Sequence, residues 1–324
     1  MKMTKSFVAT ATNAIIATCV AGSAMAADIY VIGGKPDDPF WSRVKMGAED
    51  AGIVAEMQGG SVTWLGPQNY DNLGPDAAEL IRQAIDQGAD AIVGPDWVPE
   101  AMDPAFEAVV AAGIPLVIYN AGGMEATDKL GALNYVGAVD YKSGFAAGEY
   151  LGNAGKTNGA CVNTLPGAAN IEAFCAGFNA GIEAVGGAGS VLQLPATSFG
   201  DATAVAQAVR AHLLQNPEID ALFAIGDADT NAAVSGIQQA GKADQVSICG
   251  MNFNESILAN IQAGTQACAI DQQGYQQGFF AVSILNNYVN YGVTIPTREI
   301  LTGPGIIDSS NVELVIEGVK AGAR

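Results

Sequence analysis

Two asparagines follow apolar strands that occupy equivalent places in the two halves of the chain. Asn120 ends the stretch 88–120 and Asn252 ends the stretch 219–252, and each stretch reads as strand, helix, strand. A repeated βαβ unit predicts two similar domains with parallel sheets. Because open parallel sheets bind ligands at the carboxyl ends of their strands, we expect both amides to face one shared cleft.

Aromatic and acidic side chains stand at other junctions of this kind. Phe40 and Trp41 follow the first strand and could present flat apolar surface to a ligand. The alternative is that they staple the first helix to its preceding loop. Asp38 and Asp227 lie just before helices, so each could bind a ligand or cap a helix N-terminus.

Motifs for metals, nucleotides and nucleophiles fail on inspection. The stretch 227–231 opens like a calcium loop, but Ala232 stands where glycine is needed and no glutamate follows at the twelfth position. We therefore interpret it as helix capping. Gly33 and Gly34 do not form a dinucleotide fingerprint. His212 has no accompanying nucleophile motif, so we expect no cofactor, no metal and no catalytic residue.

Short strands alternate with amphipathic helices along the chain, which predicts an α/β protein with doubly wound parallel sheets. Pro104 is expected near a helix start. The expected strands are 29–32, 62–65, 91–93, 116–119, 161–164, 191–194, 221–225, 246–250, 267–270 and 300–301, and the expected helices are 40–57, one around 80–85, 104–111, 143–151, 171–185, 202–214, 231–240, 256–262 and 276–291.

The N-terminal residues have the features of an export signal, so we do not expect them to belong to the fold. A basic start, an apolar stretch 7–20 and Ala24-Met25-Ala26 are typical of a secretory signal peptide over residues 1–26. We expect the mature chain to begin at Ala27 and to be periplasmic. Cys19 suggests a lipid anchor as an alternative, but Thr18 fits poorly before it and the Ala-x-Ala site follows, so we expect none.

The charge balance limits the possible partners. The chain has 33 acidic and 14 basic residues, and a formal net charge of −19. Nucleic-acid binding depends on basic surface, so this composition argues against it. Docking on anionic lipid is disfavoured for the same reason.

Four cysteines follow the expected cleavage site: Cys161, Cys175, Cys249 and Cys268. An exported protein meets an oxidising compartment, where they could pair. Of the three possible connectivities, the local pairs 161–175 and 249–268 are the more plausible. The alternative is that all four are small buried hydrophobic residues.

The ordered set of motifs resembles the type I periplasmic sugar-binding proteins of the ribose-binding family. The similarity covers essentially the whole mature chain. It rests on Asp37-Asp38-Pro39-Phe40-Trp41, Gly88-Ala-Asp-Ala-Ile-Val, Ala112-Gly-Ile-Pro-Leu-Val-Ile, Gly137 to Gly148, Ala176-Gly-Phe, Ile219-Asp-Ala-Leu-Phe-Ala and Ile270-Asp-Gln-Gln-Gly-Tyr-Gln-Gln-Gly. The resemblance implies two lobes joined by three hinge crossings, near 137–140, 270–273 and 301–303. The N-terminal lobe would be 27–137 plus 274–301, and the C-terminal lobe 138–273 plus 302–324.

The resemblance also implies a set of ligand-binding residues. Asp38, Asn120, Asn252 and Gln272 match polar ligand positions of the family, and Asp227 lies in a loop that carries one. Phe40 and Trp41 would stack on the sugar, and Phe199 would be a second aromatic wall. The chain departs from the family at two positions that often hold sugar-binding arginines, which read Ala121 and Phe174, and at Gly94 and Gly226, which replace side-chain amides. The pocket should therefore be more aromatic and less cationic than a ribose site, and its ligand a neutral sugar or polyol.

Three functions remain open on this interpretation. The first is a monomeric binding protein that delivers a small neutral sugar or polyol to an ABC permease in the inner membrane. The second is a sensor that presents the same liganded form to a chemoreceptor or histidine kinase. The third is a secreted glycosidase, which would need two carboxylates about 5–10 Å apart across the cleft, as Asp38 and Asp227 could be.

Overall fold

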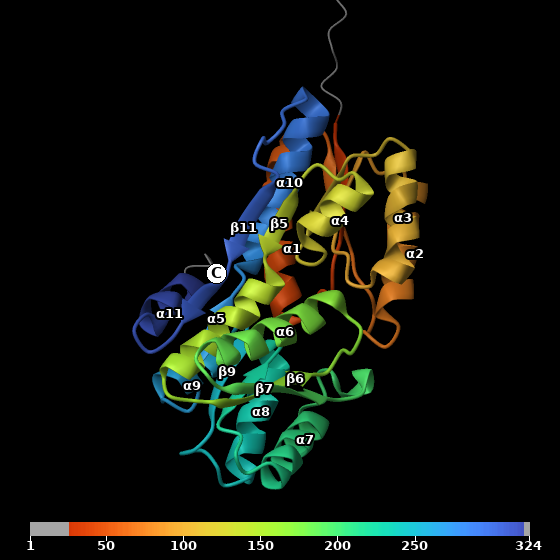
Figure 1. The fold of residues 1–324 in the computed structure, drawn as a ribbon. Helices are drawn as coiled ribbons and strands as arrows, with labels where there is room; N and C mark the ends of the chain where they lie inside the picture. Colours follow the sequence, from red (N-terminus) through yellow and green to blue (C-terminus); the bar gives the residue numbers. More distant parts are fainter. Residues whose placement is uncertain (1–25, 321–324) are drawn as a thin grey trace, which may run out of the picture.

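Two six-stranded sheets with the same strand order form the framework of the protein (Figure 1). The computed structural model describes residues 26–320, so the expected signal peptide, apart from Ala26, and Cys19 lie outside the described residues. The first sheet has the order β11-β5-β4-β3-β1-β2 and the second has the order β12-β10-β9-β8-β6-β7. This identical order confirms the duplicated α/β architecture that the repeated βαβ unit predicts.

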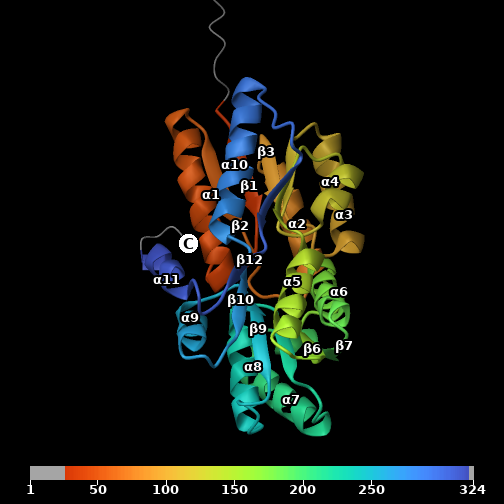
Figure 2. The same cartoon turned by 60° about the vertical axis from the view of Figure 1, so that its left-hand side comes forward.

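The N-lobe is the first sheet with the helices that cover it. Its strands are all parallel, with α1 and α10 on one face and α2, α3 and α4 on the other (Figures 1 and 2). The strands are β1 (Asp28–Ile32), β2 (Ser61–Leu65), β3 (Ala91–Gly94), β4 (Leu116–Tyr119), β5 (Tyr135–Ala138) and β11 (Glu299–Gly303), and the helices are α1 (Pro39–Met57), α2 (Leu73–Asp86), α3 (Pro99–Ala111), α4 (Gly123–Leu130) and α10 (Gly274–Tyr291).

The C-lobe is built on the second sheet in the same way. Its strands run parallel except for β12, which pairs antiparallel with β10. The strands are β6 (Asn158–Asn163), β7 (Ala188–Gln193), β8 (Ala221–Ala224), β9 (Ser247–Met251), β10 (Cys268–Asp271) and β12 (Gly305–Ile307), and the helices are α5 (Asp140–Asn153), α6 (Ala169–Ala184), the 3₁₀ turn Ala196–Ser198, α7 (Ala202–Gln215), α8 (Asp227–Gln239), α9 (Glu255–Gln262) and α11 (Val312–Lys320).

Glycines bring one helix pair in each lobe into close contact. A Cβ on Gly278 of α10 would lie 2.0 Å from the Val44 carbonyl oxygen of α1, and one on Gly144 of α5 would lie 2.0 Å from the Phe174 carbonyl oxygen of α6. Any side chain at these glycines would push the helices apart. Together with the fully buried strands β3, β4, β5 and β8, this close packing fixes the strand ends that carry the site.

The chain passes between the two sheets three times. The passages lie between β5 and α5, between β10 and α10, and between β11 and β12. They fall at the three crossings that the family resemblance implies.

The structure corrects several expectations about elements. The expected set lacks helix α4 (Gly123–Leu130), and α8 begins at Asp227 rather than at residue 231. Helix α3 begins at Pro99, so Pro104 lies inside the helix rather than near its start. The tail also contains β12 and α11, although the sequence shows strand character there only at Ile300–Leu301. A three-residue strand is too short to show a period in the sequence.

The cysteines pair as Cys161–Cys175 and Cys249–Cys268, the two local pairs favoured by the sequence. The first joins β6 to α6, and the second joins the neighbouring strands β9 and β10. Both therefore reinforce the C-lobe core. Within residues 26–320 no helix combines the length and the apolar character that a membrane crossing requires.

Candidate functional site

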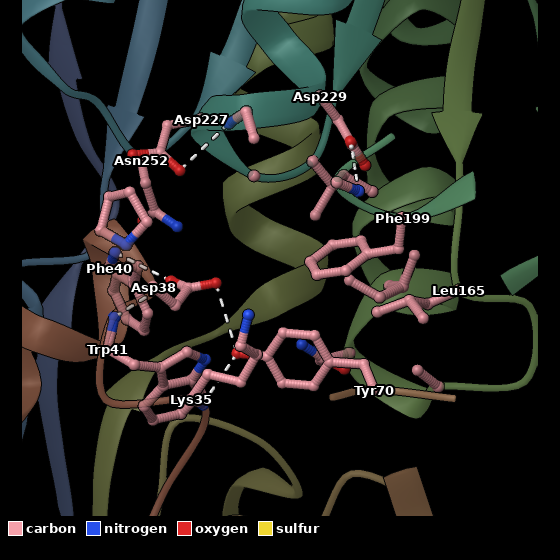
Figure 3. A pocket seen from close by; sticks show the side chains of 18 of the residues that line it. Lys35, Asp38, Phe40, Trp41, Tyr70, Leu165, Phe199, Asp227, Asp229 and Asn252 are labelled. Atoms are coloured by element: carbon pink, nitrogen blue, oxygen red, sulfur yellow. Dashed lines mark hydrogen bonds between the residues drawn. The ribbon is translucent and has the colours of Figure 1, made fainter. Parts of the chain in front are cut away.

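A cavity of about 350 Å³ lies between the lobes at the carboxyl ends of the strands (Figure 3). Side chains from both lobes line it. All eight residues singled out in the sequence are among them, namely Asp38, Phe40, Trp41, Asn120, Phe199, Asp227, Asn252 and Gln272. The structure therefore brings these eight residues together at one cavity.

Asp38 both caps helix α1 and lines the cavity, so the two alternatives for this residue are compatible. Its Oδ1 accepts hydrogen bonds from the backbone N–H of Phe40 at 3.0 Å and of Trp41 at 3.2 Å. Its Oδ2 accepts from the Tyr70 hydroxyl at 3.3 Å. Burial raises the pKa of Asp38, although these hydrogen bonds oppose the shift. The cap thus orients one carboxylate edge and leaves the other at the cavity.

Aromatic rings form much of the cavity wall. Trp41 is 8% exposed and packs edge-on against Phe40, with centroids 5.1 Å apart, and against Trp97 at 5.3 Å. Across the cavity, Tyr70 meets Phe199 edge-on at 5.2 Å. Trp41 consequently belongs to the N-lobe core and to the cavity wall at once, and the neighbouring rings hold its indole in place.

Asn120 and Asn252 adopt the same unusual backbone conformation directly after β4 and β9. Their φ angles are 62° and 63°, in the left-handed region that asparagine tolerates better than most residues. The Asn120 Nδ2 donates to Gln277 Oε1 at 3.2 Å, and the Asn252 Oδ1 accepts from Gln272 Nε2 at 3.2 Å. Both amides are therefore held in place at the cavity by a neighbouring glutamine.

Three buried oxygens at the cavity have no hydrogen-bond partner among the described residues. They are Asp227 Oδ2, Gln272 Oε1 and Asn170 Oδ1. Each can accept a hydrogen bond, and leaving a buried acceptor unpaired costs about 1–3 kcal/mol. The arrangement is therefore suited to a ligand that donates several hydrogen bonds.

Asp227 and Asp229 lie in the first turn of α8, but neither caps it. Gly226 is the N-cap residue, without a side-chain cap, while Asp227 Oδ1 accepts from the Ala228 N–H at 3.1 Å. Asp229 accepts from Thr164 Oγ1 at 2.6 Å and from the Gly200 N–H at 3.0 Å. The capping interpretation of this motif is thus wrong. Asp229 instead ties the segment that carries Phe199 to the end of β6.

Burial has a strong effect on these carboxyls. It raises the pKa of Asp227 to about 6, and the nearby guanidinium of Arg43 opposes the shift while Asp38 adds to it. It also raises the pKa of Asp229 to about 6, against the hydrogen bonds from Thr164 and Gly200. Near neutral pH both groups are mostly ionised, so the cavity is acidic.

No arginine lines the cavity at the two positions where sugar-binding relatives often carry one, but a lysine does line it. Phe174 lines the cavity, whereas Ala121 is fully buried beside it. Lys35, which the sequence argument missed, is the one basic side chain among the described lining residues, and its ammonium lies 3.6 Å from the Asp37 carboxylate. Among the described lining residues, the single cation is thus already paired with an anion.

Several other lining residues escaped the sequence argument. Tyr70 and Trp97 follow β2 and β3 by a few residues, so the strand-end rule could have identified them. Leu165 lies between β6 and α6, and Asn170 and Ile171 lie in the first turn of α6. Within the described residues no three His, Cys, Asp or Glu side chains gather as a metal site would require.

Comparison with known proteins agrees with this geometry. A sequence model described as "Periplasmic binding protein domain" matches residues 29–292. The solved structure of a carbohydrate transporter from Acidothermus cellulolyticus 11B in complex with myo-inositol is 31% identical, with a TM-score of 0.81 over 92% of this chain and 99% of that one.

Two curated relatives are more distant. The xylose/arabinose-binding protein XylF of Sulfolobus acidocaldarius is 24% identical, over 88% of this chain and 72% of its own length. A D-ribose/D-allose-binding protein of Pseudomonas aeruginosa is 29% identical, over 63% of this chain and 64% of its own length. The chain therefore belongs to the periplasmic binding protein family, with the type I fold of its sugar-binding members.

Proposed function

We propose that this protein is the extracytoplasmic substrate-binding component of an ABC importer and captures a small neutral sugar or polyol between its lobes. The observation that carries the proposal is the group of unpaired acceptors Asp227 Oδ2, Gln272 Oε1 and Asn170 Oδ1 beside aromatic walls. Hydroxyl groups would supply the missing donors, and the C–H face of the ligand would pack on the rings.

Charge favours a neutral ligand. Lys35 is engaged with Asp37, and Asp38, Asp227 and Asp229 also line the cavity. A carboxylate or phosphate buried there would lie near these anions without a free cationic partner, which costs several kcal/mol. Sugar acids and sugar phosphates are therefore excluded in this proposal.

The relatives support the ligand class. Those compared above are described as binding xylose or arabinose, ribose or allose, and myo-inositol. These compounds are small, uncharged and rich in hydroxyl groups. Monosaccharides, deoxysugars and cyclitols are accordingly the first compounds to test.

Binding would close the two lobes around the ligand. We assign 27–137 and 274–301 to the N-lobe, and 138–273 and 302–324 to the C-lobe, with the three passages as the hinge. Closure brings the stacking surface and the acceptors together and gives the permease a shape to recognise. In this proposal the protein acts as a monomer in the periplasm, without a cofactor.

Two measurements on the purified protein test the proposal. Mass spectrometry of compounds released on denaturation identifies what was bound, and intact recovery separates binding from hydrolysis by Asp38 and Asp227. A thermal-shift panel then compares myo-inositol, pentoses, hexoses and deoxysugars with uronic acids and sugar phosphates. We expect only neutral compounds to raise the melting temperature. A rise with the anionic compounds alone would overturn this view of the pocket.

A further inference from the structure

The two lobes touch directly at contacts around the cavity, and one of these contacts carries a charge. The Trp97 carbonyl of the N-lobe accepts a hydrogen bond from the Ala169 N–H of the C-lobe at 3.0 Å. The rings of Tyr70 and Phe199 meet across the lobes, with centroids 5.2 Å apart. The third contact is made by Arg43, which lies on the first turns of α1.

Arg43 reaches from the N-lobe to the backbone of the C-lobe. Its Nη2 donates to the carbonyl oxygen of Phe253 at 2.7 Å, and its guanidinium carbon lies 4.9 Å from the centroid of the Phe253 ring. Phe253 is 3% exposed and lies between β9 and α9. Figure 2 shows α1 running down toward the C-lobe. The contact combines a charge-assisted hydrogen bond with a cation–π interaction.

The same guanidinium lies among carboxylates from both lobes. It attracts Asp38 of the N-lobe and Asp227 and Asp271 of the C-lobe. This attraction lowers the pKa of Asp38 and of Asp227 against the effect of burial. Moving the lobes apart would separate Arg43 from the two C-lobe carboxylates and from the Phe253 carbonyl together.

Arg43 does not line the main cavity. It lies in an adjoining cavity of about 150 Å³, which shares Phe40 and Asn252 with the main one. Arg43 would therefore affect binding by changing how the lobes are held together and the charge near the carboxylates, not by contacting a ligand.

We propose that Arg43 is a positioning residue that clasps the lobes in the closed form through the Phe253 carbonyl and ring. The proposal rests on the function proposed above. It adds that the closed form is favoured by a contact which the ligand does not make. Loss of the clasp should shift the open–closed equilibrium about tenfold or more toward the open form, the effect of one charged hydrogen bond.

The main test compares Arg43→Gln, which keeps polarity and loses charge, with the wild-type protein. Small-angle scattering without added compounds measures the radius of gyration, which we expect to be larger in the variant. Stopped-flow kinetics use whichever of myo-inositol, D-xylose, D-ribose and D-galactose stabilises the wild type in the thermal-shift panel. We expect dissociation about tenfold faster or more, with an association rate changed much less.

Two readouts distinguish a clasp from general damage. Without the positive charge of Arg43 the pKa of Asp227 should be higher, so binding to Arg43→Gln should weaken at a higher pH than binding to the wild type. Arg43→Lys restores the charge, so it should restore the wild-type pH dependence and part of the slow dissociation. Phe253→Leu keeps the carbonyl but removes the ring, so it should have a smaller effect of the same kind. Arg82→Gln, at an exposed position of α2, is the matched control for the loss of one arginine and should resemble the wild type.

The outcomes separate this proposal from the proposed function. If none of the four compounds binds the wild type, the proposed ligand class fails for them and the scattering comparison alone decides the role of Arg43. An Arg43→Gln protein with the wild-type radius of gyration and, where a compound binds, the wild-type dissociation rate and pH dependence would overturn the clasp.

Discussion

Asp227→Asn should make the protein more stable and its binding weaker. Asp227 is 4% exposed, and its Oδ2 has no partner among the described residues. Burial raises its pKa from 3.8 to about 6, and a shift of that size corresponds to about 3 kcal/mol for keeping the carboxyl ionised in the fold. Asparagine has nearly the same shape without the charge. We therefore expect the free energy of unfolding at pH 7 to rise by up to about 3 kcal/mol.

The sign of the pH effect follows from the same shift. Because the folded pKa lies above the unfolded one, the folded protein binds the extra proton between pH 3.8 and about 6. The contribution of Asp227 to stability thus falls as the pH rises through this window and is constant above it. The stability advantage of Asp227→Asn should be largest at pH 7 and vanish near pH 4.

Binding should respond in the opposite direction. A hydroxyl that donates to Oδ2 favours the ionised carboxylate, so affinity of the wild type should fall below pH 6, by up to about tenfold per pH unit. A hydrogen bond to a charged group contributes about 1.5–3 kcal/mol, so Asp227→Asn should lose roughly tenfold or more in affinity at pH 7. Its affinity should also vary little with pH across this range.

Urea unfolding without ligand at pH 4–8 measures the first effect, and calorimetry with the compound selected by thermal shift measures the second. Asp244→Asn, at an exposed position, is the control for removal of one negative charge. If Asp227→Asn is less stable than the wild type at pH 7 and binds with the same affinity and pH profile, the assignment of Asp227 as an unpaired buried acceptor for the ligand is wrong.

Three further predictions concern the walls, the hinge and the core. Trp41→Ala should weaken binding about tenfold or more through lost stacking, as measured by calorimetry on protein shown to be folded by circular dichroism, and wild-type affinity would confine Trp41 to the core. Small-angle scattering should give a smaller radius of gyration with saturating ligand, and an unchanged radius would count against a hinge. Cys161→Ala with Cys175→Ala should lower the free energy of unfolding by about 3 kcal/mol, because the disulfide closes a short loop with a sequence separation of 14 residues. The variant should be as stable as the wild type in a reducing buffer and less stable in an oxidising one, as measured by urea unfolding. Equal stability of the two proteins in both buffers would refute this account.

The sequence predicts those site residues that a repeated local pattern marks. Asn120 and Asn252 end equivalent strands, and the structure gives both the same left-handed backbone. Phe40 and Trp41 lie at the start of α1, which follows β1 after a short loop. In each case a few neighbouring residues determine the position, so no knowledge of distant segments is required.

The sequence does not predict which side chains of distant segments contact each other. Asp229 looks like a helix-cap residue in its local sequence, but its partner Thr164 is 65 residues away. The Arg43 side chain meets a carbonyl 210 residues further along the chain. Which of several nearby acceptors such a side chain reaches depends on how the lobes pack, and periodicity carries no information about that.

Both lobes contribute rings and polar groups to the cavity, but its unpaired oxygens lie on the C-lobe. The N-lobe supplies the packed rings of Phe40, Trp41 and Trp97, whereas the unpaired oxygens of Asp227 and Asn170 belong to the C-lobe. A polyol that first stacks on the N-lobe can satisfy these oxygens only when the C-lobe closes over it. The hydroxyls thus favour the closed form over the open one, and a compound that stacks without donating hydrogen bonds gives no such preference. In the proposed function, the acceptors of the C-lobe are therefore the groups that would convert ligand recognition into closure.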